Sequence, residues 1–336
     1  MAQASNYFPS QAVELFYQKE AVVGTSPDNN DLIKLQATSF TIPDRSVAIE
    51  YSAQRSGSYV TQSTQGVHAQ GSNLWTFDTV FKGTVKAVRL ATEALFEDGG
   101  SDGTAHLFNT YSFPIESYKD AQTANTFEFR FENAGPDSSS NNILCNGCVA
   151  TGMTLSQDIG SEGGELVCTI NWATAYFPAY GSSALGGTSV HDTATPKNIR
   201  DLNPPNTVID SEELVVQSWE LSVNRTIERI HYSDITAGSF HPFGYAMTSP
   251  FEITGSLTVI RNDDVHDLLA NFYNSTGVDL KIAEASDFSV DINLAVLGES
   301  TVDNGGAVLT QNIPFTAVAN EDIGGSSEQV LGITIA

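Results

Sequence analysis

Residues 163–175, GGELVCTINWATA, alternate apolar and polar side chains after a pair of glycines, and a similar stretch, GGAVLTQNIPFTAVA, occupies residues 305–319. Alternation of this kind is typical of a strand with one buried face. When one extra residue is allowed after the second glycine pair, the apolar positions coincide: Leu166 with Leu309, Ile170 with Ile313 and Trp172 with Phe315. The chain therefore contains two versions of one strand.

Three further pairs of stretches recur upstream in the same order. They are SVAIEYS (46–52) with SWELSVN (218–224), FDTVFKGTV (77–85) with FEITGSLTV (251–259), and FEFRFE (127–132) with FSVDINL (288–294). Four matches in one order are hard to obtain by chance. We therefore expect an internal duplication, with inserted loops such as 98–106 and 135–142 lengthening the first copy.

The same stretches predict which side chains are buried, because successive side chains of a strand point to opposite faces. The expected inward sets are Phe127, Phe129 and Phe131; Phe288, Val290, Ile292 and Leu294; and Phe251, Ile253, Leu257 and Val259. The residues between them, such as Glu128, Arg130 and Glu132, are expected to face outward. Each copy is also expected to carry one short helix, at 91–98 and at 262–274.

The chain divides into four predicted parts. They are an N-terminal arm (1–32), a first β domain (33–180), a linker or long loop rich in Gly, Ser, Thr and Pro (181–206), and a second β domain (207–336). The arm contains four aromatic residues, so it either crosses to an adjacent subunit or is buried against its own domain.

Composition limits the possible partners. The 15 Lys and Arg residues and 40 Asp and Glu residues give a formal charge of −25, which leaves no cationic stripe for specific binding of nucleic acid. The N-terminus lacks the basic flank and apolar run of a signal peptide, and no stretch approaches the ~18 apolar residues of a membrane span. We expect a protein made in a cytoplasm, without membrane contact.

The sequence offers little catalytic chemistry. Cys145 and Cys148 form a C-x-x-C motif, but a structural zinc site needs four ligands, and a redox pair normally opens a helix. Buried, reduced cysteines in strands are the simpler interpretation, with a metal or redox role as the alternative. The six histidines form no metal-binding pattern, and no serine elbow or phosphate loop is present. We expect neither enzymatic activity nor a cofactor.

Two segments resemble a known family. GCVATGMTLS (147–156), with the GGELVCTINW strand after it, and SWELSVN…PFGYAMTSPFEITGSLTVIRNDD in the second half are similar to major tail tube proteins of long-tailed, siphovirus-type bacteriophages. The resemblance runs from about Ile33 to Thr334. It implies a mainly β chain of two tandem tail-tube-type β-sandwich or barrel domains, each with one short flanking α-helix.

The family resemblance also implies a function. Such proteins form rings that stack helically into a hollow tail tube, through which the genome passes into the host. A chain with two copies of the domain is expected to form trimeric, pseudo-hexameric rings. The implied partners are further copies of the chain, a tape-measure protein, tail terminator and baseplate or distal tail proteins, and genomic DNA in transit without specific binding. The implied location is the phage tail in the virion, assembled in the host cytoplasm.

A conduit for DNA must not hold the DNA. We expect outward-facing acidic residues on the long strands, namely Glu50, Asp78, Glu220 and Glu252, to include residues that line the bore. The alternative for each residue is that it merely solvates an outer wall.

Two other functions are compatible with the composition. A carbohydrate-binding or adhesin-like β-sandwich of a virion surface would carry exposed Trp or Tyr clusters in loops, whereas Trp172 and Trp219 lie in alternating strands. A hydrolase on a β scaffold would need a cleft with a perturbed acid or histidine, and no sequence feature identifies such a residue.

Overall fold

The fold was analysed in a computed structural model of the chain. The structure describes residues 13–21, 24, 32–34, 37–43, 49–51, 66–68, 74–95, 105–109, 125–134, 141–181, 190–191, 194–202, 206–231, 242–249, 251–262, 277–284, 287–318 and 329–335. The protein is mainly β. Among the described residues, no helix is both long and apolar enough to cross a membrane.

Among the described residues, the first half contains eleven strands and one α-helix. They are β1 (Glu14–Lys19), β2 (Ile33–Lys34), β3 (Ala37–Phe40), β4 (Ile49–Tyr51), β5 (Gly66–His68), β6 (Trp75–Lys82), α1 (Val85–Leu95), β7 (Ala105–Asn109), β8 (Phe127–Glu132), β9 (Asn142–Asp158), β10 (Val167–Thr174) and β11 (Ala179–Gly181). A short 3-10 turn, η4 (Glu162–Gly164), connects β9 to β10.

In the rest of the chain, the described residues form mainly strands. They are β12 (Val190–His191), β13 (Val208–Ile209), β14 (Glu212–Glu213), β15 (Val216–Asn224), β16 (Ile227–His231), β17 (Pro242–Met247), β18 (Glu252–Ile260), β19 (Val278–Ala283), β20 (Phe288–Leu297), β21 (Thr301–Asp303), β22 (Thr310–Ala317) and β23 (Gln329–Ile335). A 3-10 turn, η5 (Ile199–Asp201), precedes β13.

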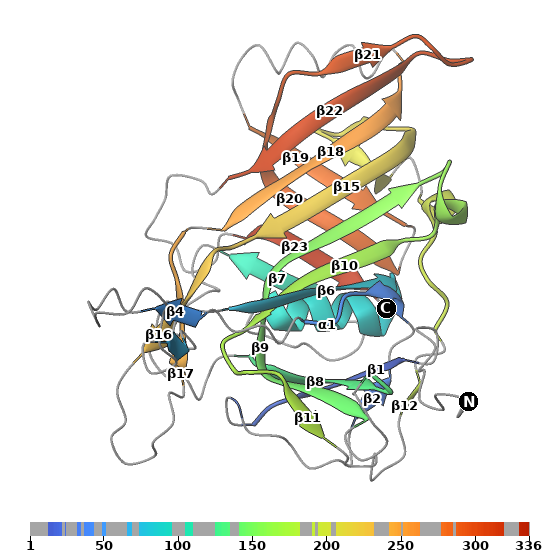
Figure 1. The fold of residues 1–336 in the computed structure, drawn as a ribbon. Helices are drawn as coiled ribbons and strands as arrows, with labels where there is room; N and C mark the ends of the chain where they lie inside the picture. The colour runs from blue at the N-terminus through green and yellow to red at the C-terminus, as the bar shows by residue number, and fades with distance from the viewer. Residues whose placement is uncertain are drawn as a thin grey trace, which may run out of the picture.

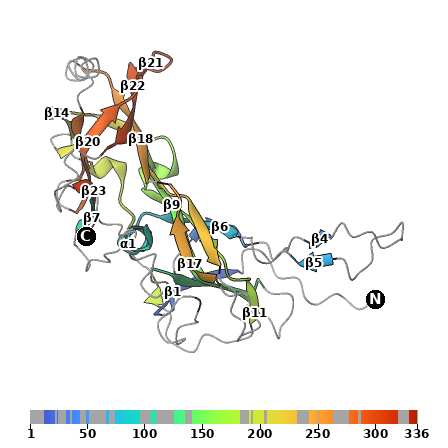
Figure 2. The same ribbon diagram turned by 90° about the vertical axis from the view of Figure 1, so that its left-hand side faces the viewer.

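Eight of the described strands form one antiparallel layer, which we call the front sheet. Its strands follow the order β3, β6, β10, β9, β15, β18, β22 and β21 (Figure 1). Behind it lie β19, β20, β23 and β7, so that the upper part of the molecule has two layers (Figures 1 and 2). The N-terminal half of β9 leaves the front sheet and pairs with β8, which in turn pairs with β1. The pair β9–β15 joins the two halves of the chain.

A continuous apolar core lies between the layers and includes residues from both halves. In the first half the ring of Phe129 is 4.5 Å from that of Trp172, and Phe77 meets Phe129 edge-on at 5.3 Å. In the second half Trp219 stacks on Phe288 at 6.1 Å. Tilted and edge-on aromatic pairs of this kind stabilise a core beyond the area they bury. Helix α1 packs against β9, β10 and β23.

The alternation predicted most of the burial correctly, with two exceptions. Phe127, Phe129 and Phe131 are buried, but Glu128 and Arg130 on the opposite face of β8 are only 1% and 2% exposed. They satisfy each other through an ion pair of 2.9 Å. A period-two pattern cannot reveal that the second face of a strand is also covered.

Leu294 is the other exception, because the inward face changes within β20. Ile292 and Ala295 are both buried, and Leu294 is only partly buried. Their partners on β19 are Leu280 and Val278, so the two residues of β20 between Ile292 and Ala295 lie opposite the single residue Asp279 of β19. This β-bulge shifts the alternation by one residue.

Helix α1 begins earlier than predicted, at Val85 rather than Ala91. The side-chain oxygen of Thr84 accepts a hydrogen bond from the backbone N–H of Ala87 at 3.3 Å, which caps the helix start. The helix predicted at 262–274 lies outside the described residues, except for Asn262.

Parts of the predicted arm and linker belong to the folded body. Residues 14–19 form β1, which pairs along its whole length with β8, so the hypothesis of an arm crossing to another subunit does not apply to them. Residues 194–202 of the predicted linker are also docked, since Leu166 N–H donates to Lys197 O at 2.7 Å and Lys197 N–H donates to Gly83 O at 3.1 Å.

The same set of strand pairings occurs in each half. The pairs β1–β2, β3–β6, β4–β5, β6–β10, β8–β9 and β9–β11 are matched by β13–β14, β15–β18, β16–β17, β18–β22, β19–β20 and β20–β23. Two register shifts are also matched. The shift at Ala37/Ser39 opposite β6 has its equivalent at Val216/Ser218 opposite β18, and that at Phe127/Phe129 opposite β9 has its equivalent at Val278/Leu280 opposite β20.

Three of the four predicted sequence matches do not follow this pattern of pairings. By pairing, β8 (127–132) corresponds to β19 rather than to 288–294, and β15 (216–224) corresponds to β3 rather than to 46–52. The match of 77–85 with 251–259 is displaced by four residues, since Trp172 faces Phe77 whereas Phe315 faces Gly255. The match between β10 and β22 agrees with the pairing.

Candidate functional surface

The outward face of the front sheet is a continuous polar surface. Along β15, the inward residues Trp219, Leu221 and Val223 are at most 2% exposed, while the residues between them face out. The same alternation on the neighbouring strands exposes mainly Ser, Thr and Asn side chains: Thr169 and Asn171 on β10, Thr154 and Ser156 on β9, Ser218, Ser222 and Asn224 on β15, Thr254, Ser256 and Thr258 on β18, and Asn312 and Thr316 on β22.

Strand register aligns these side chains in rows across the sheet. From β10 to β22, one row consists of hydroxyl-bearing residues, with each residue directly opposite the next: Thr169, Thr154, Ser222, Thr254 and Thr316. On β6 the row continues with Val80, opposite Thr169. Within it, the side-chain oxygens of Thr154 and Ser222 are 3.0 Å apart and share a hydrogen bond. Directly opposite residues of antiparallel strands have Cβ atoms ~5 Å apart, so from β10 to β22 this row forms an unbroken band of hydroxyl groups.

Three of the four predicted acidic residues lie on this surface. Asp78 on β6, Glu220 on β15 and Glu252 on β18 all occupy outward positions. Asp78 and Glu252 belong to one cross-strand row, in which they are separated by Asn171, Gly152 and Asn224. Asp78 is held in place by Thr41, whose hydroxyl donates to the Asp78 carboxylate at 2.6 Å.

Glu50 does not lie on the front sheet. It belongs to β4, where it pairs with Val67 of β5 in a separate two-stranded ladder, and its side chain lies outside the described part. Asp158, at the exposed end of β9, joins the surface instead. The alternation of apolar and polar residues in 153–158 could have predicted the outward position of Asp158 from the sequence.

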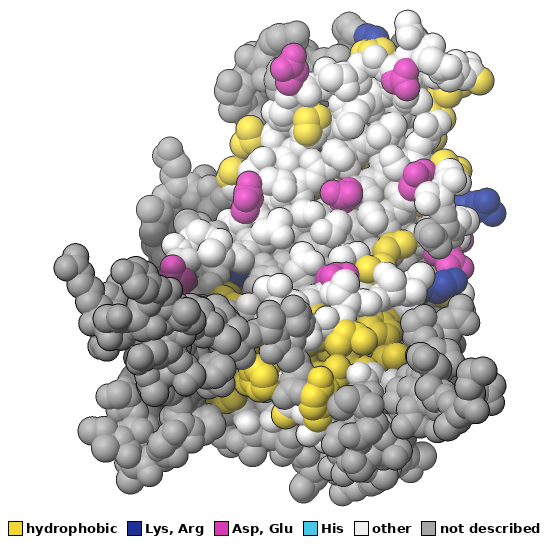
Figure 3. All heavy atoms as spheres, viewed as in Figure 1, with side chains coloured by type: hydrophobic (Ala, Val, Ile, Leu, Met, Phe, Trp, Pro, Cys, Tyr) yellow, Lys and Arg dark blue, Asp and Glu magenta, His cyan; other side chains and the backbone are white. Residues whose placement is uncertain are grey.

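The surface carries more negative than positive charge. The outward positions of β6, β9, β10, β15, β18 and β22 carry four carboxylates and one cation, Lys82. The carboxylates are those of Asp78, Asp158, Glu220 and Glu252. The ammonium of Lys82 lies 2.6 Å from the carboxylate of Glu165, so that its charge is already balanced. Figure 3 shows the acidic side chains as separate points on a largely uncharged polar face. The surface is therefore hydrophilic, weakly acidic and without a cationic track.

The three cysteines do not lie on this surface. Cys145 and Cys148 on β9 and Cys168 on β10 are free thiols with no measurable exposure, which confirms their predicted burial in strands. Burial raises the pKa of Cys168 to about 12 and also raises the pKa of Cys148. Because the thiolate is the reactive form, the raised pKa values keep Cys148 and Cys168 in the less reactive thiol form at neutral pH.

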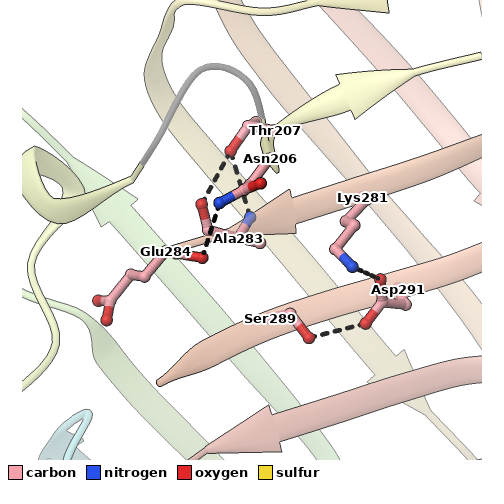
Figure 4. A network of polar contacts seen from close by, with 7 residues as sticks. All are labelled: Asn206, Thr207, Lys281, Ala283, Glu284, Ser289 and Asp291. Carbon is pink, nitrogen blue, oxygen red and sulfur yellow. Dashed lines mark hydrogen bonds and ion pairs between the residues drawn. The ribbon is translucent and has the colours of Figure 1, made fainter. Parts of the chain in front are cut away.

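A second polar cluster lies on β19 and β20 of the rear layer (Figure 4). The hydroxyl of Thr207 donates to Ala283 O and accepts from Ala283 N, both at 3.2 Å, which fastens the segment before β13 to the end of β19. Nearby, Lys281 pairs with Asp291 at 3.2 Å. These groups satisfy one another, so the cluster has a structural role.

Comparison with known proteins returned no relative. The chain matches no protein-family model, and no curated protein is significantly similar to it.

Proposed function

We propose that this protein is a structural virion subunit that assembles with its own copies into hollow rings, which stack into the tail tube of a long-tailed bacteriophage. The polar outward face of the front sheet would line the bore. The observation that carries this proposal is the band of hydroxyl groups over five antiparallel strands, together with separated carboxylates and no unpaired cation at the outward positions of these strands and of β6.

Such a lining suits the passage of DNA. Duplex DNA carries one negative charge per ~1.7 Å of its axis, so a lysine-rich or arginine-rich bore would retain it. At about 10 Å in water, one charge pair is worth only ~0.4 kcal/mol before screening, and the Debye length is ~8 Å at physiological salt. Only side chains on the lining itself can therefore act. On this surface those would be Asp78, Glu220 and Glu252, together with Asp158.

We also propose that the two halves of the chain are copies of one domain. The matched strand pairings support this, and the two matched register shifts support it further, because a β-bulge is a local feature that related domains keep. Three such chains would supply six equivalent positions around a ring. Head-to-tail contacts close into rings when the rotation per subunit permits.

The proposed partners follow from the tube. They are further copies of the chain, a tape-measure protein that fills the bore before ejection, terminator and distal tail proteins at the two ends, and DNA in transit. The alternative of a carbohydrate-binding protein is less well supported, because Trp172 and Trp219, at 1% and 2% exposed, are not available to stack on sugars.

Electron microscopy of the purified protein tests the proposal. Negative-stain images over a range of concentrations should contain rings or tubes with a stain-filled centre, and mass photometry should give discrete masses at multiples of the 36.0 kDa chain. A single 36.0 kDa species at every concentration would contradict the proposal.

A further inference from the structure

In the front sheet, the two halves of the chain meet at the strand pair β9–β15, which has a buried centre. β15 pairs with the C-terminal half of β9 from Ser218 opposite Asp158 to Asn224 opposite Gly152. Leu221 and Leu155, which face each other there, both have no measurable exposure. Beside them the indole N–H of Trp219 donates to the side-chain oxygen of Gln157 at 2.7 Å.

In the described part of the chain, the equivalent strand edges at the two ends of the front sheet have no pairing partner. By its pairing with β6, β3 corresponds to β15, and by its pairing with β22, β21 corresponds to residues 154–156 of β9. Among the described residues, β3 pairs only with β6 and β21 only with β22. The front sheet of one chain thus ends on one side with β3, the equivalent of β15, and on the other side with β21, the equivalent of part of β9.

Exposed apolar residues mark both edges. Ile42, two residues beyond Phe40 of β3, is 41% exposed, and Val302 in the middle of β21 is 48% exposed. Their equivalents at the internal junction are the buried Leu221 and Leu155. Two large aliphatic side chains are therefore exposed at the two positions where the internal junction buries two leucines.

The backbone of the β3 edge is ready for pairing. Thr41 N–H donates to Asp78 O at 3.0 Å, which directs Thr41 toward β6. Since adjacent residues of a strand direct their N–H and C=O groups to opposite edges, those of Ile42 point to the open side. Pro43, which has no N–H, is oriented like Thr41 and leaves the open edge intact.

The two β-hairpins provide a second, independent comparison between the internal junction and the open edges. Tyr245 of the β16–β17 hairpin accepts a hydrogen bond from Ala175 N at 2.9 Å, and the hairpin covers Val149, which is 1% exposed. The equivalent of Val149 in the second half is Val296, which is 42% exposed. The equivalent hairpin, β4–β5, has the same antiparallel ladder and projects away from the other described elements (Figure 2).

We propose that the open edges bind each other between copies of this chain. β3 of one chain would pair antiparallel with β21 of the next, with Ile42 opposite Val302 and Thr41 opposite Asp303. The β4–β5 hairpin of the first chain would then cover Val296 of its neighbour. The inference rests on the proposed ring, and it assigns the strands, register and apolar contacts by which the ring closes.

Cysteine cross-linking tests the register. Thr41 and Asp303 would face each other with Cα atoms ~4.5–5.5 Å apart, within the range of a disulfide. In the double variant Thr41→Cys/Asp303→Cys, mild oxidation should give covalent oligomers that stop at the number of chains in one ring. The single variants should stay monomeric on a non-reducing gel, because the native cysteines are buried.

The matched control is Thr41→Cys/Asn312→Cys. Asn312 lies on the same face as Asp303 but on the next strand and opposite Thr301, so two strand spacings and two residues along the strand place it about 12 Å from the partner's Thr41. This pair should not cross-link. A further outcome is that electron microscopy shows rings in an oxidised Thr41→Cys/Asp303→Cys sample whose chains run as monomers on the gel. That result would overturn the proposed register but not the proposed tube. Absence of rings in the wild-type protein would instead reject the proposed function.

A second pair of variants tests the apolar contact independently. Ile42→Asp should shift the population to single chains, because it places a charge opposite Val302. Val80→Asp, which adds the same charge to the partly exposed centre of β6, should leave ring formation unchanged. Equal assembly of both variants would contradict the proposal.

Discussion

At the residue scale, Glu20 shows how one polar side chain joins distant parts of the fold. It is 6% exposed, and its carboxylate accepts hydrogen bonds from Gly147 N–H at 2.7 Å, Gly24 N–H at 2.8 Å and the Thr126 hydroxyl at 2.7 Å. The end of β1 is thereby fixed to a turn within β9. Burial is the largest influence on Glu20 and raises its pKa above 4.5, although the three hydrogen bonds act in the opposite direction.

The raised pKa predicts a pH-dependent contribution of Glu20 to stability. A carboxyl with a higher pKa in the folded state binds its proton more tightly there, so its contribution is fully present below about pH 4.5 and declines as the pH rises through the folded pKa. We expect the free energy of unfolding of wild type, relative to Glu20→Gln, to fall over this window. Urea unfolding of both proteins between pH 4 and pH 7 measures it, and a difference that is independent of pH would contradict the assignment.

At the element scale, Gly255 allows the front sheet to pack. It lies in the middle of β18, on the inward face between Leu221 and Phe315. A Cβ atom at this position would be 2.3 Å from the backbone oxygen of Glu220 and 2.3 Å from the Phe315 ring. The strand can therefore place only glycine here without moving its neighbours.

We expect Gly255→Ala to lower the free energy of unfolding by about 3 kcal/mol, the upper part of the range for overpacked cores. Gly306→Ala is the matched control, since its Cβ would have its nearest neighbour at 3.6 Å, and it should change stability by less than about 0.5 kcal/mol. Denaturant unfolding at low protein concentration measures both. Similar losses of unfolding free energy in the two variants would show that the close contacts at Gly255 do not determine the packing of the sheet.

The sequence predicted the positions of the strands better than it predicted which strands pair with one another. Alternation in 251–259 identified the buried Ile253, Leu257 and Val259, and the same rule placed Asp78, Glu220 and Glu252 on an outward face. It could not predict the bulge that displaces Leu294 from the core. Nor could it separate Glu50, in the isolated β4–β5 ladder, from the acids of the front sheet. Register and bulges depend on contacts between distant segments, which periodicity does not report.

At the scale of the whole molecule, the two ends of the front sheet complement each other. Among the described residues, β3 and β21 each have one unpaired edge, and because they lie at opposite ends of the front sheet they do not pair with each other within one chain. Native proteins usually protect such edges, because unpaired strands associate readily. Closure into a ring removes both edges at once and turns one face of every front sheet toward a common axis.

The orientation of that face is the central claim, and a cryo-electron microscopy map of the assembled particle tests it most directly. The account predicts a closed ring in which Glu220, Ser222 and Thr254 point into the bore and β3 of each chain lies beside β21 of the next. A ring whose bore is lined by β19 and β20, or by lysine and arginine side chains, would contradict it.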